Sequence, residues 1–114
     1  MEIHVEQENS VRIIALSGRL DIMHAEGFEN TINEYIDGLN ESKMLIDCEN
    51  LTFISSAGLR VFMIALKKMK AKLGKLVLTG MNESNRKVFQ ITGYEKLFTI
   101  ADTREEGLSL FYLS

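Results

Sequence analysis

Apolar and polar residues alternate at the start of the chain, in the pattern of a strand with one face in water. Residues 3–6, IHVE, show this alternation, and residues 11–16, VRIIAL, are β-branched and mostly apolar. Asn9 and Ser10 lie between the two runs and suit a tight turn. The pattern predicts a hairpin of two strands at the beginning of the chain.

Two longer segments have apolar residues at the three- and four-residue spacing of an amphipathic helix. The first segment, residues 24–39, keeps this spacing up to Leu39. The second predicted helix begins with SSAG at Ser55 and ends at Gly74. We expect the apolar stripe of the second helix to face the sheet and Lys67, Lys68 and Lys70 to be mostly exposed. The stripe consists of Leu59, Phe62, Met63, Leu66, Met69 and Leu73.

Shorter segments between and after these helices predict the remaining elements. Strands are expected at 43–49, 75–80 and 97–100, and helices at 82–92 and 102–113. LTFI, residues 51–54, is interpreted as the loop after the first of these strands. Asn82 is the expected N-cap of its helix and Gly93 its end, and the last helix is expected to start on Asp102 or Thr103.

After the hairpin, helices and strands therefore alternate. Strands that are separated by helices pair in parallel through right-handed crossovers. Proline is absent and no linker-like stretch interrupts the pattern. The sequence predicts one α/β domain over residues 1–114, with a mainly parallel sheet and an antiparallel first strand.

Charge and hydropathy limit the classes of partner. The net charge is −3 and the pI is about 5.4, which argues against nucleic acid as the main partner. No apolar run is long enough for membrane insertion, and the polar residues after Met1 do not resemble a secretory signal, so we expect a cytoplasmic protein. One basic cluster is interpreted as a solvated helix side, with a docking surface for an acidic partner as the alternative. It consists of Lys67, Lys68, Lys70, Lys72 and Lys75.

The residues that enzymes use for chemistry are few. Cys48 is the only cysteine, which excludes an internal disulfide and a Cys₄ or Cys₂His₂ zinc site, and we expect it to be a buried thiol. The two histidines, His4 and His24, lie on an edge strand and at a helix start, and ISSAG is not the G-x-S-x-G motif of hydrolases. No glycine-rich phosphate loop is present. We expect no enzyme activity, no cofactor and no metal.

Ser55 and Ser56 stand at the start of the second helix, followed by Ala57 and Gly58. An N-cap role explains one serine, and helix packing would explain the glycine. The second hydroxyl and the glycine also suit a surface that another molecule approaches closely. The amino end of a helix in addition favours anions.

At these residues the chain resembles a known family. IDCENLTFISSAGLRVF is similar to the signature segment of STAS domains, above all the bacterial anti-sigma factor antagonists. The resemblance extends to LSGRLD, to KLVLTGMNESNRKVFQITGYEKLFTI and to the final helix. It implies a sheet of four or five strands with helices mainly on one face.

The resemblance also implies a mechanism. In the family, the unphosphorylated antagonist binds an anti-sigma factor that is also a serine kinase, and a sigma factor is freed. The kinase phosphorylates a signature serine, which ends binding, and a PP2C-type phosphatase reverses the step. The family's acceptor falls on Ser56, with Ser55 as the alternative, and its loop aspartate on Asp21. The implied partner surface comprises Asp21, Ser55, Ser56, Ala57, Gly58 and Arg60.

The chain departs from the family pattern at two of these positions. Many members have aspartate in place of Ser55, and some have glycine in place of Arg60. Aspartate and serine are both strong N-caps, so the cap is retained while a charge is lost. The alternative hypothesis is a STAS accessory subunit of an ABC-type lipid transporter or of another signalling complex, and a serine hydrolase is a distant third.

Overall fold

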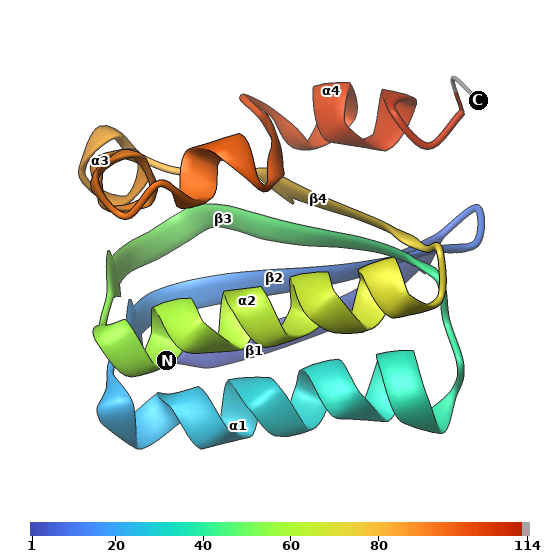
Figure 1. Ribbon diagram of the computed structural model, residues 1–114, viewed down its shortest axis with the longest axis horizontal. Helices are drawn as coiled ribbons and strands as arrows, with labels where there is room; N and C mark the ends of the chain where they lie inside the picture. Colours follow the sequence, from blue (N-terminus) through green and yellow to red (C-terminus); the bar gives the residue numbers. More distant parts are fainter. Residues whose placement is uncertain (113–114) are drawn as a thin grey trace.

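The computed structural model describes residues 1–112, and the chain begins with an antiparallel hairpin (Figure 1). β1 (Glu2–Glu8) pairs with β2 (Val11–Leu20). Asn9 and Ser10 have φ angles of 48° and 71°, and two positive φ values are typical of the type I′ turn that suits the twist of a hairpin. The predicted hairpin and its turn are confirmed.

Within residues 1–112, three further strands, all parallel to β2, complete the sheet in the order β1-β2-β3-β4-β5. They are β3 (Lys43–Ile54), β4 (Lys75–Thr79) and β5 (Thr99–Ala101). The mainly parallel sheet with an antiparallel first strand is therefore confirmed. The loop predicted at 51–54 is wrong, because these residues continue β3 and pair with the end of β2, where Leu20 is the register partner of Ile54.

The helices agree with the predicted order but differ at their ends. They are α1 (Ile22–Asn33), the π-helical turn η1 (Glu34–Gly38), α2 (Ser56–Ala71), α3 (Glu83–Ile91), the 3₁₀ turn η2 (Tyr94–Lys96) and α4 (Arg104–Ser109). Asn82 and Thr103 are confirmed as N-caps. Leu39 is exposed instead of buried, because the π-helical turn ends before it. Leu113, the last residue of the predicted final helix, lies outside the described residues.

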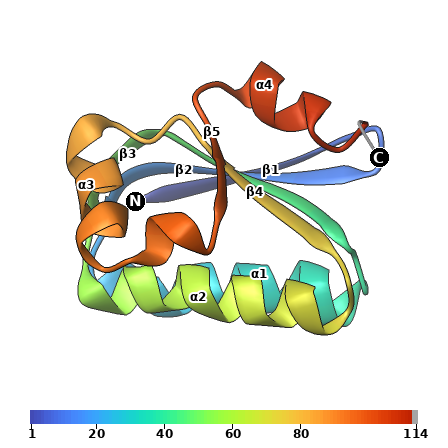
Figure 2. The same ribbon diagram turned by 45° about the horizontal axis from the view of Figure 1, so that its top comes forward.

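The helices form two unequal layers around the sheet (Figures 1 and 2). α1, α2 and α3 pack on one face in a large apolar cluster, whereas α4 covers part of the other face. The smaller cluster under α4 consists of Val11, Ile13, Leu45, Val77, Leu108 and Phe111. Helices lying mainly on one face are thus confirmed. Within residues 1–112, none of the helices combines the length and apolar character needed to cross a bilayer.

Aromatic rings connect the three helices of the larger layer. The Phe62 ring lies edge-on to Phe28 at 5.2 Å and to Phe89 at 5.6 Å between ring centroids. All three rings are fully buried. Edge-to-face pairs add to the free energy gained from burial alone, so Phe62 is a central residue of this core.

The carboxyl end of α2 corrects one member of the predicted stripe. Leu73 adopts φ 57° and is 95% exposed, and Met63 is only partly buried, whereas Leu59, Phe62 and Leu66 are buried as predicted. The Leu73 N–H donates to Lys70 O at 3.1 Å and the Gly74 N–H to Met69 O at 2.8 Å, which is the Schellman pattern with Leu73 in the left-handed position. Leu73 therefore leaves the helical stripe one residue before the predicted stop at Gly74.

The lysines of the basic cluster are not all free in solvent. Lys67 and Lys70 are exposed, and Lys75 is exposed but donates to the carbonyl of Leu110, whereas Lys68 is half-buried and pairs with Asp37. The Lys72 ammonium donates to the carbonyl of Ile36 in η1 and to two acceptors, on Asn40 and Glu41, in the loop that follows. The expectation for Lys68 is therefore wrong, since the end of α1 and η1 packs beside α2.

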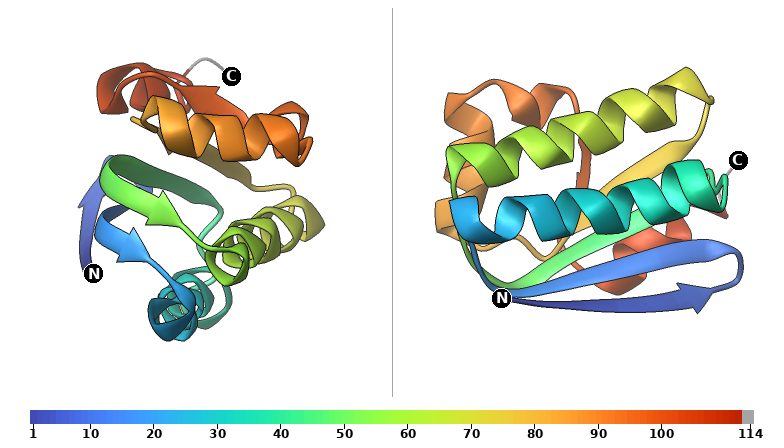
Figure 3. Two further views of the ribbon diagram at one scale, coloured as in Figure 1. Left: turned by 90° about the vertical axis from the view of Figure 1, so that its left-hand side faces the viewer. Right: turned by 90° about the horizontal axis from the view of Figure 1, so that it is seen from below.

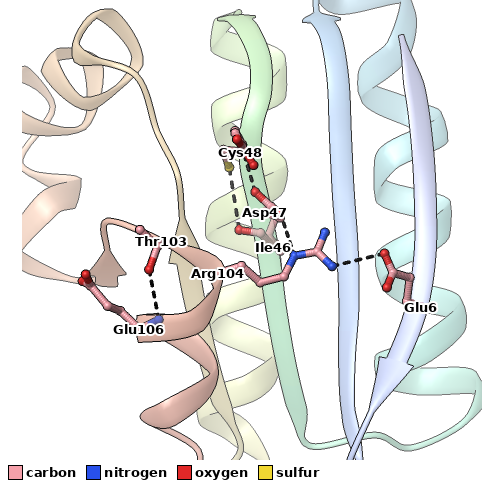
Figure 4. Close-up of polar contacts among 8 residues, drawn as sticks. Glu6, Ile46, Asp47, Cys48, Thr103, Arg104 and Glu106 are labelled. Atoms are coloured by element: carbon pink, nitrogen blue, oxygen red, sulfur yellow. Dashed lines mark hydrogen bonds and ion pairs between the residues drawn. The ribbon is translucent and has the colours of Figure 1, made fainter.

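Polar contacts fix α4 to the sheet (Figure 4). The Arg104 Nε donates to Asp47 Oδ2 at 2.9 Å, and its Nη1 donates to Glu6 Oε1 at 3.2 Å. Asp47 is only 6% exposed, so this guanidinium compensates a buried charge. A Cβ on Gly107 would lie 2.3 Å from the Thr79 Cγ2, which shows how closely α4 approaches β4.

Cys48 lies in β3 and is fully buried, as predicted. Burial raises the pKa of its thiol far above the ordinary value, with a further contribution from the neighbouring Asp47 carboxylate. The thiol is therefore protonated at neutral pH and acts as a small apolar side chain.

Candidate functional site

The parallel pairing of β2 and β3 brings the amino ends of α1 and α2 to the same edge of the sheet. Leu20 and Ile54 are register partners at the carboxyl ends of these strands, and Asp21 and Ser55 follow them directly. Figure 3 shows the two helices side by side with their first turns at this edge. The topology therefore places the predicted residues Asp21 and Ser55–Arg60 in one region.

Ser55 is confirmed as the N-cap of α2. Its Oγ accepts a hydrogen bond from the Gly58 N–H at 3.1 Å, and its own N–H donates to Leu20 O at 2.9 Å. The second bond ties the start of α2 to the residue that precedes Asp21. The Ser55 hydroxyl is thus committed to holding the helix start.

Ser56 is the first residue of α2 and is exposed. It has the helical conformation, so its backbone N–H is one of the free N–H groups at the amino end of the helix. Its hydroxyl faces solvent one position beyond the cap. The two adjacent serines therefore differ: one holds the helix and the other is accessible.

Gly58 is buried, and packing explains it. A Cβ at this position would lie 2.5 Å from Leu20 Cγ, 2.7 Å from Leu20 Cδ2 and 3.0 Å from Leu20 O. Leu20 of the same chain occupies the space that a side chain at Gly58 would need, so close packing accounts for the glycine, and its contact with a partner stays a prediction. The packing alternative is confirmed.

Replacing Gly58 with alanine is expected to lower the free energy of unfolding by about 1–3 kcal/mol, since Leu20 and the helix start must shift apart. Gly27 provides the matched control. It is exposed within α1, and nothing lies within 4 Å of a Cβ built there. Gly27→Ala should raise stability by about 0.5–1 kcal/mol. Chemical denaturation of both variants measures the contrast, and equal effects at the two positions would contradict the packing explanation.

Asp21 stands in the short connection between β2 and α1, as predicted, and its side chain also caps α1. Its Oδ1 accepts hydrogen bonds from the Met23 N–H at 3.1 Å and the His24 N–H at 3.2 Å, and it lies 2.7 Å from His24 Nδ1. Desolvation raises the pKa of Asp21, but the bonds and charge of His24 and the Met23 N–H outweigh it, so the pKa is below its ordinary value. The carboxylate is thus charged at neutral pH and still partly accessible.

Ala57 and Arg60 complete the predicted set. Ala57 is half-buried and packs against the larger apolar cluster, so only part of it faces outward. Arg60 is exposed and follows Ser56 by four residues, which places it one helical turn away on the same side of α2.

The structure adds two features to this edge that the sequence prediction missed. Ile22 and Met23, in the first turn of α1, are 75% and 82% exposed. The Arg19 guanidinium stacks over the partly exposed Phe53 ring, 4.3 Å from the ring centroid. Starting the helix at residue 24 concealed the first feature, and the loop predicted at 51–54 concealed the second.

Comparison with known proteins identifies the family. The model of the STAS domain family matches residues 2–107, which is nearly all of the chain. The chain belongs to the STAS domain family. The strand–helix order around the two capped helix starts is therefore that of a STAS domain, and Ser55–Arg60 lies within the matched residues.

Known relatives of this STAS domain include anti-sigma factor antagonists. The chain is 31% identical to BtrV of Bordetella bronchiseptica, a candidate anti-sigma factor antagonist, over 97% of this chain and 95% of the relative. A candidate anti-sigma factor antagonist from Thermotoga maritima has a similar structure, with a TM-score of 0.90, 21% identity, and coverage of 94% of this chain and 92% of the other. At this level of identity the likeness shows the fold.

The solved structures that resemble this STAS domain also include SpoIIAA in two states. The unphosphorylated anti-sigma factor antagonist SpoIIAA matches with a TM-score of 0.80 and 23% identity, over 99% of this chain and all (100%) of the other. The phosphorylated SpoIIAA of Bacillus matches with a TM-score of 0.77 and 24% identity, over 96% and 99% of the two chains. SpoIIAA thus keeps the STAS fold in both states.

Proposed function

We propose that this STAS domain is an anti-sigma factor antagonist whose binding is switched off by phosphorylation of Ser56. The observation that carries the proposal is that the two serines at the start of α2 have different roles. Ser55 is engaged as the N-cap, while the next hydroxyl is exposed on a firmly held helix start. The relative BtrV, itself a candidate anti-sigma factor antagonist with 31% identity to this chain, supports the same function.

In the proposed cycle, the unmodified chain binds an anti-sigma factor that is also a serine kinase, and a sigma factor is released. The kinase then transfers the γ-phosphoryl group of ATP to the Ser56 oxygen. The Oγ–P bond forms as the bond to ADP breaks, and the hydroxyl proton passes to a base of the kinase. A PP2C-type phosphatase hydrolyses the phosphoester and restores the binding form.

Ser56 is a better acceptor than Ser55 for a geometric reason. The Ser55 Oγ is already the acceptor for the Gly58 N–H at 3.1 Å, and Ser55 is half-buried beside Leu20. A phosphoryl group on that oxygen would displace the cap and crowd the helix start. On Ser56 the same group would extend into solvent at the amino end of α2.

The charge of the phosphate supplies the switch. Phosphorylation adds about −1.5 to −2 charge units, which the amino end of a helix tolerates but an interface that buries Ser56 does not. Moving binding from 99:1 to 1:99 takes a difference of about 5.5 kcal/mol between the two forms. Taking a charged group out of water into an interface costs several kcal/mol even after the protein relaxes, which is a penalty of that order.

In this proposal the chain is a binding protein and a phosphoryl acceptor, and it has no catalysis of its own. Isothermal titration of the unmodified chain with its cognate serine kinase tests the function. We expect a saturable complex that the fully phosphorylated chain does not form. A kinase that binds both forms equally would contradict the proposal.

Arg60 should stabilise the phosphorylated form. A phosphate on Ser56 would lie one turn from the Arg60 guanidinium, a group that pairs with phosphate through two hydrogen bonds. We expect phosphorylation to raise the free energy of unfolding by about 0.3–1 kcal/mol at low salt, and Arg60→Ala to abolish that gain without preventing modification. Lys67→Ala, also exposed on α2 but three turns away, is the control. A gain that persists in Arg60→Ala would show that the helix end alone accommodates the phosphate.

A further inference from the structure

Ile22 and Met23 are two large apolar side chains in the first turn of α1 that the fold does not use. They are 75% and 82% exposed, whereas the buried residues of α1 are Ala25, Phe28 and Ile32. First turns of helices favour acidic residues, because of the helix dipole, and that of α1 has none. Neither the core nor helix capping therefore accounts for this pair.

The pair is held in a fixed position relative to Ser56. Asp21, the cap that precedes Ile22, follows Leu20 directly, and Leu20 accepts the Ser55 N–H at 2.9 Å and packs against Gly58. The two first turns lie side by side at one edge of the sheet (Figure 3). A molecule that covers Ser56 at this edge therefore meets Ile22 and Met23 as part of the same surface.

We propose that Ile22 and Met23 form the apolar contact by which the serine kinase docks on this STAS domain. The inference rests on the proposed function and adds to it the chemistry of the partner: an apolar surface beside the part of the kinase that receives Ser56. Methionine is unbranched and flexible, so it adapts to such a surface, and burial of both side chains favours the complex.

Area and charge favour a protein partner that also covers Ser56. Two side chains expose much less than the roughly 800 Å² per partner that a stable interface buries. A partner that binds them must therefore also cover neighbouring surface, and Ser56 stands in the first turn of the neighbouring helix. A membrane is a poor partner, because α1 contains Glu26 and Glu29 and no lysine or arginine, and anionic lipid attracts basic helices.

The two parts of this surface should have separable effects. The Ile22–Met23 pair contributes binding energy that is the same for ground state and transition state, so its loss should raise the KM for phosphorylation and leave kcat unchanged. Ser56 should control whether binding is switched. Variants of the pair should therefore still be phosphorylated completely when the kinase is present at high concentration.

The test compares Ile22→Ser, Met23→Ser and the double variant with Leu73→Ser. Leu73 is 95% exposed beyond the carboxyl end of α2, roughly 24 Å of helix away from Ser56. Titration with the purified kinase should show about tenfold weaker binding for each single variant, about a hundredfold for the double variant, and no change for Leu73→Ser. Thermal unfolding of all four should be close to that of the wild type, since each side chain is exposed.

The outcomes separate this inference from the function on which it rests. If the wild type does not bind the kinase, the proposed function fails. If the wild type binds and the double variant binds equally well, the docking role of Ile22 and Met23 is overturned and the function stands. A wild-type chain that forms a dimer, which the double variant does not, would overturn the kinase as the occupant in favour of a second copy of the chain.

Discussion

Truncating Phe62 to alanine is expected to lower the free energy of unfolding by about 3–5 kcal/mol, the usual cost of removing a buried phenylalanine. Phe62 is fully buried on α2 and lies edge-on to Phe28 of α1 at 5.2 Å and to Phe89 of α3 at 5.6 Å. Its loss removes contacts to both neighbouring helices at once and leaves a cavity between them. Urea denaturation followed by circular dichroism measures the change.

Leu73→Ala is the matched control, because Leu73 and Phe62 belong to the same predicted stripe of apolar residues. Leu73 belongs to the three- and four-residue stripe, yet it is 95% exposed, so its truncation should change stability by less than about 0.5 kcal/mol. If Phe62→Ala lowers the free energy of unfolding by less than about 1 kcal/mol, the contacts among the three aromatic rings do not hold the helices together.

Replacing Ser56 with aspartate is expected to weaken binding to the serine kinase at least about a hundredfold while leaving the fold intact. A carboxylate at the first position of α2 is favourable to the helix, but it places a charge in the proposed interface. Ser56→Ala should bind like the wild type and resist phosphorylation, which fixes the protein in its binding form. Titration with the kinase and thermal unfolding report the two effects separately.

Ser84→Asp is the control for this substitution. Ser84 is exposed in the first turn of α3, so the change adds the same charge to the same kind of position on another helix. It should leave kinase binding unchanged. If Ser84→Asp weakens binding as much as Ser56→Asp does, total charge and not the position of Ser56 controls the interaction.

The local features of the fold could be predicted from the sequence because their causes are local. Asn9 and Ser10 tolerate the positive φ values of a tight turn, and Ser55 and Asn82 accept hydrogen bonds from N–H groups three residues ahead. Each of these features depends only on residues within four positions of one another in the sequence. The alternation of strands and helices along the chain is then enough to predict that the strands pair in parallel.

The predictions failed where contacts between residues that are distant in the sequence determine the local structure. Residues 51–54 form a strand only because the end of β2 pairs with them, and Gly58 is required because Leu20 occupies the space above it. The buried Asp47 finds its partner Arg104 at a distance of 57 residues in sequence. None of these contacts leaves a periodic signal in the sequence.

The candidate site shows the same division. Its position at the start of α2 and the capping role of Ser55 followed from residue type and spacing. That Asp21 caps α1, and that Ile22 and Met23 are exposed in the first turn of α1, required the observed helix start at Ile22. A difference of two residues in one predicted helix boundary was enough to hide an apolar surface.

The phosphorylation of Ser56 is the central claim, and mass spectrometry tests it most directly. The purified chain is incubated with its cognate serine kinase and ATP, and the modified residue is located by fragmentation of the peptide that contains Ser55 and Ser56. We predict one phosphoryl group, on Ser56, and none in the Ser56→Ala variant. A phosphoryl group on Ser55, or an unmodified peptide after binding to an active kinase, would contradict the account.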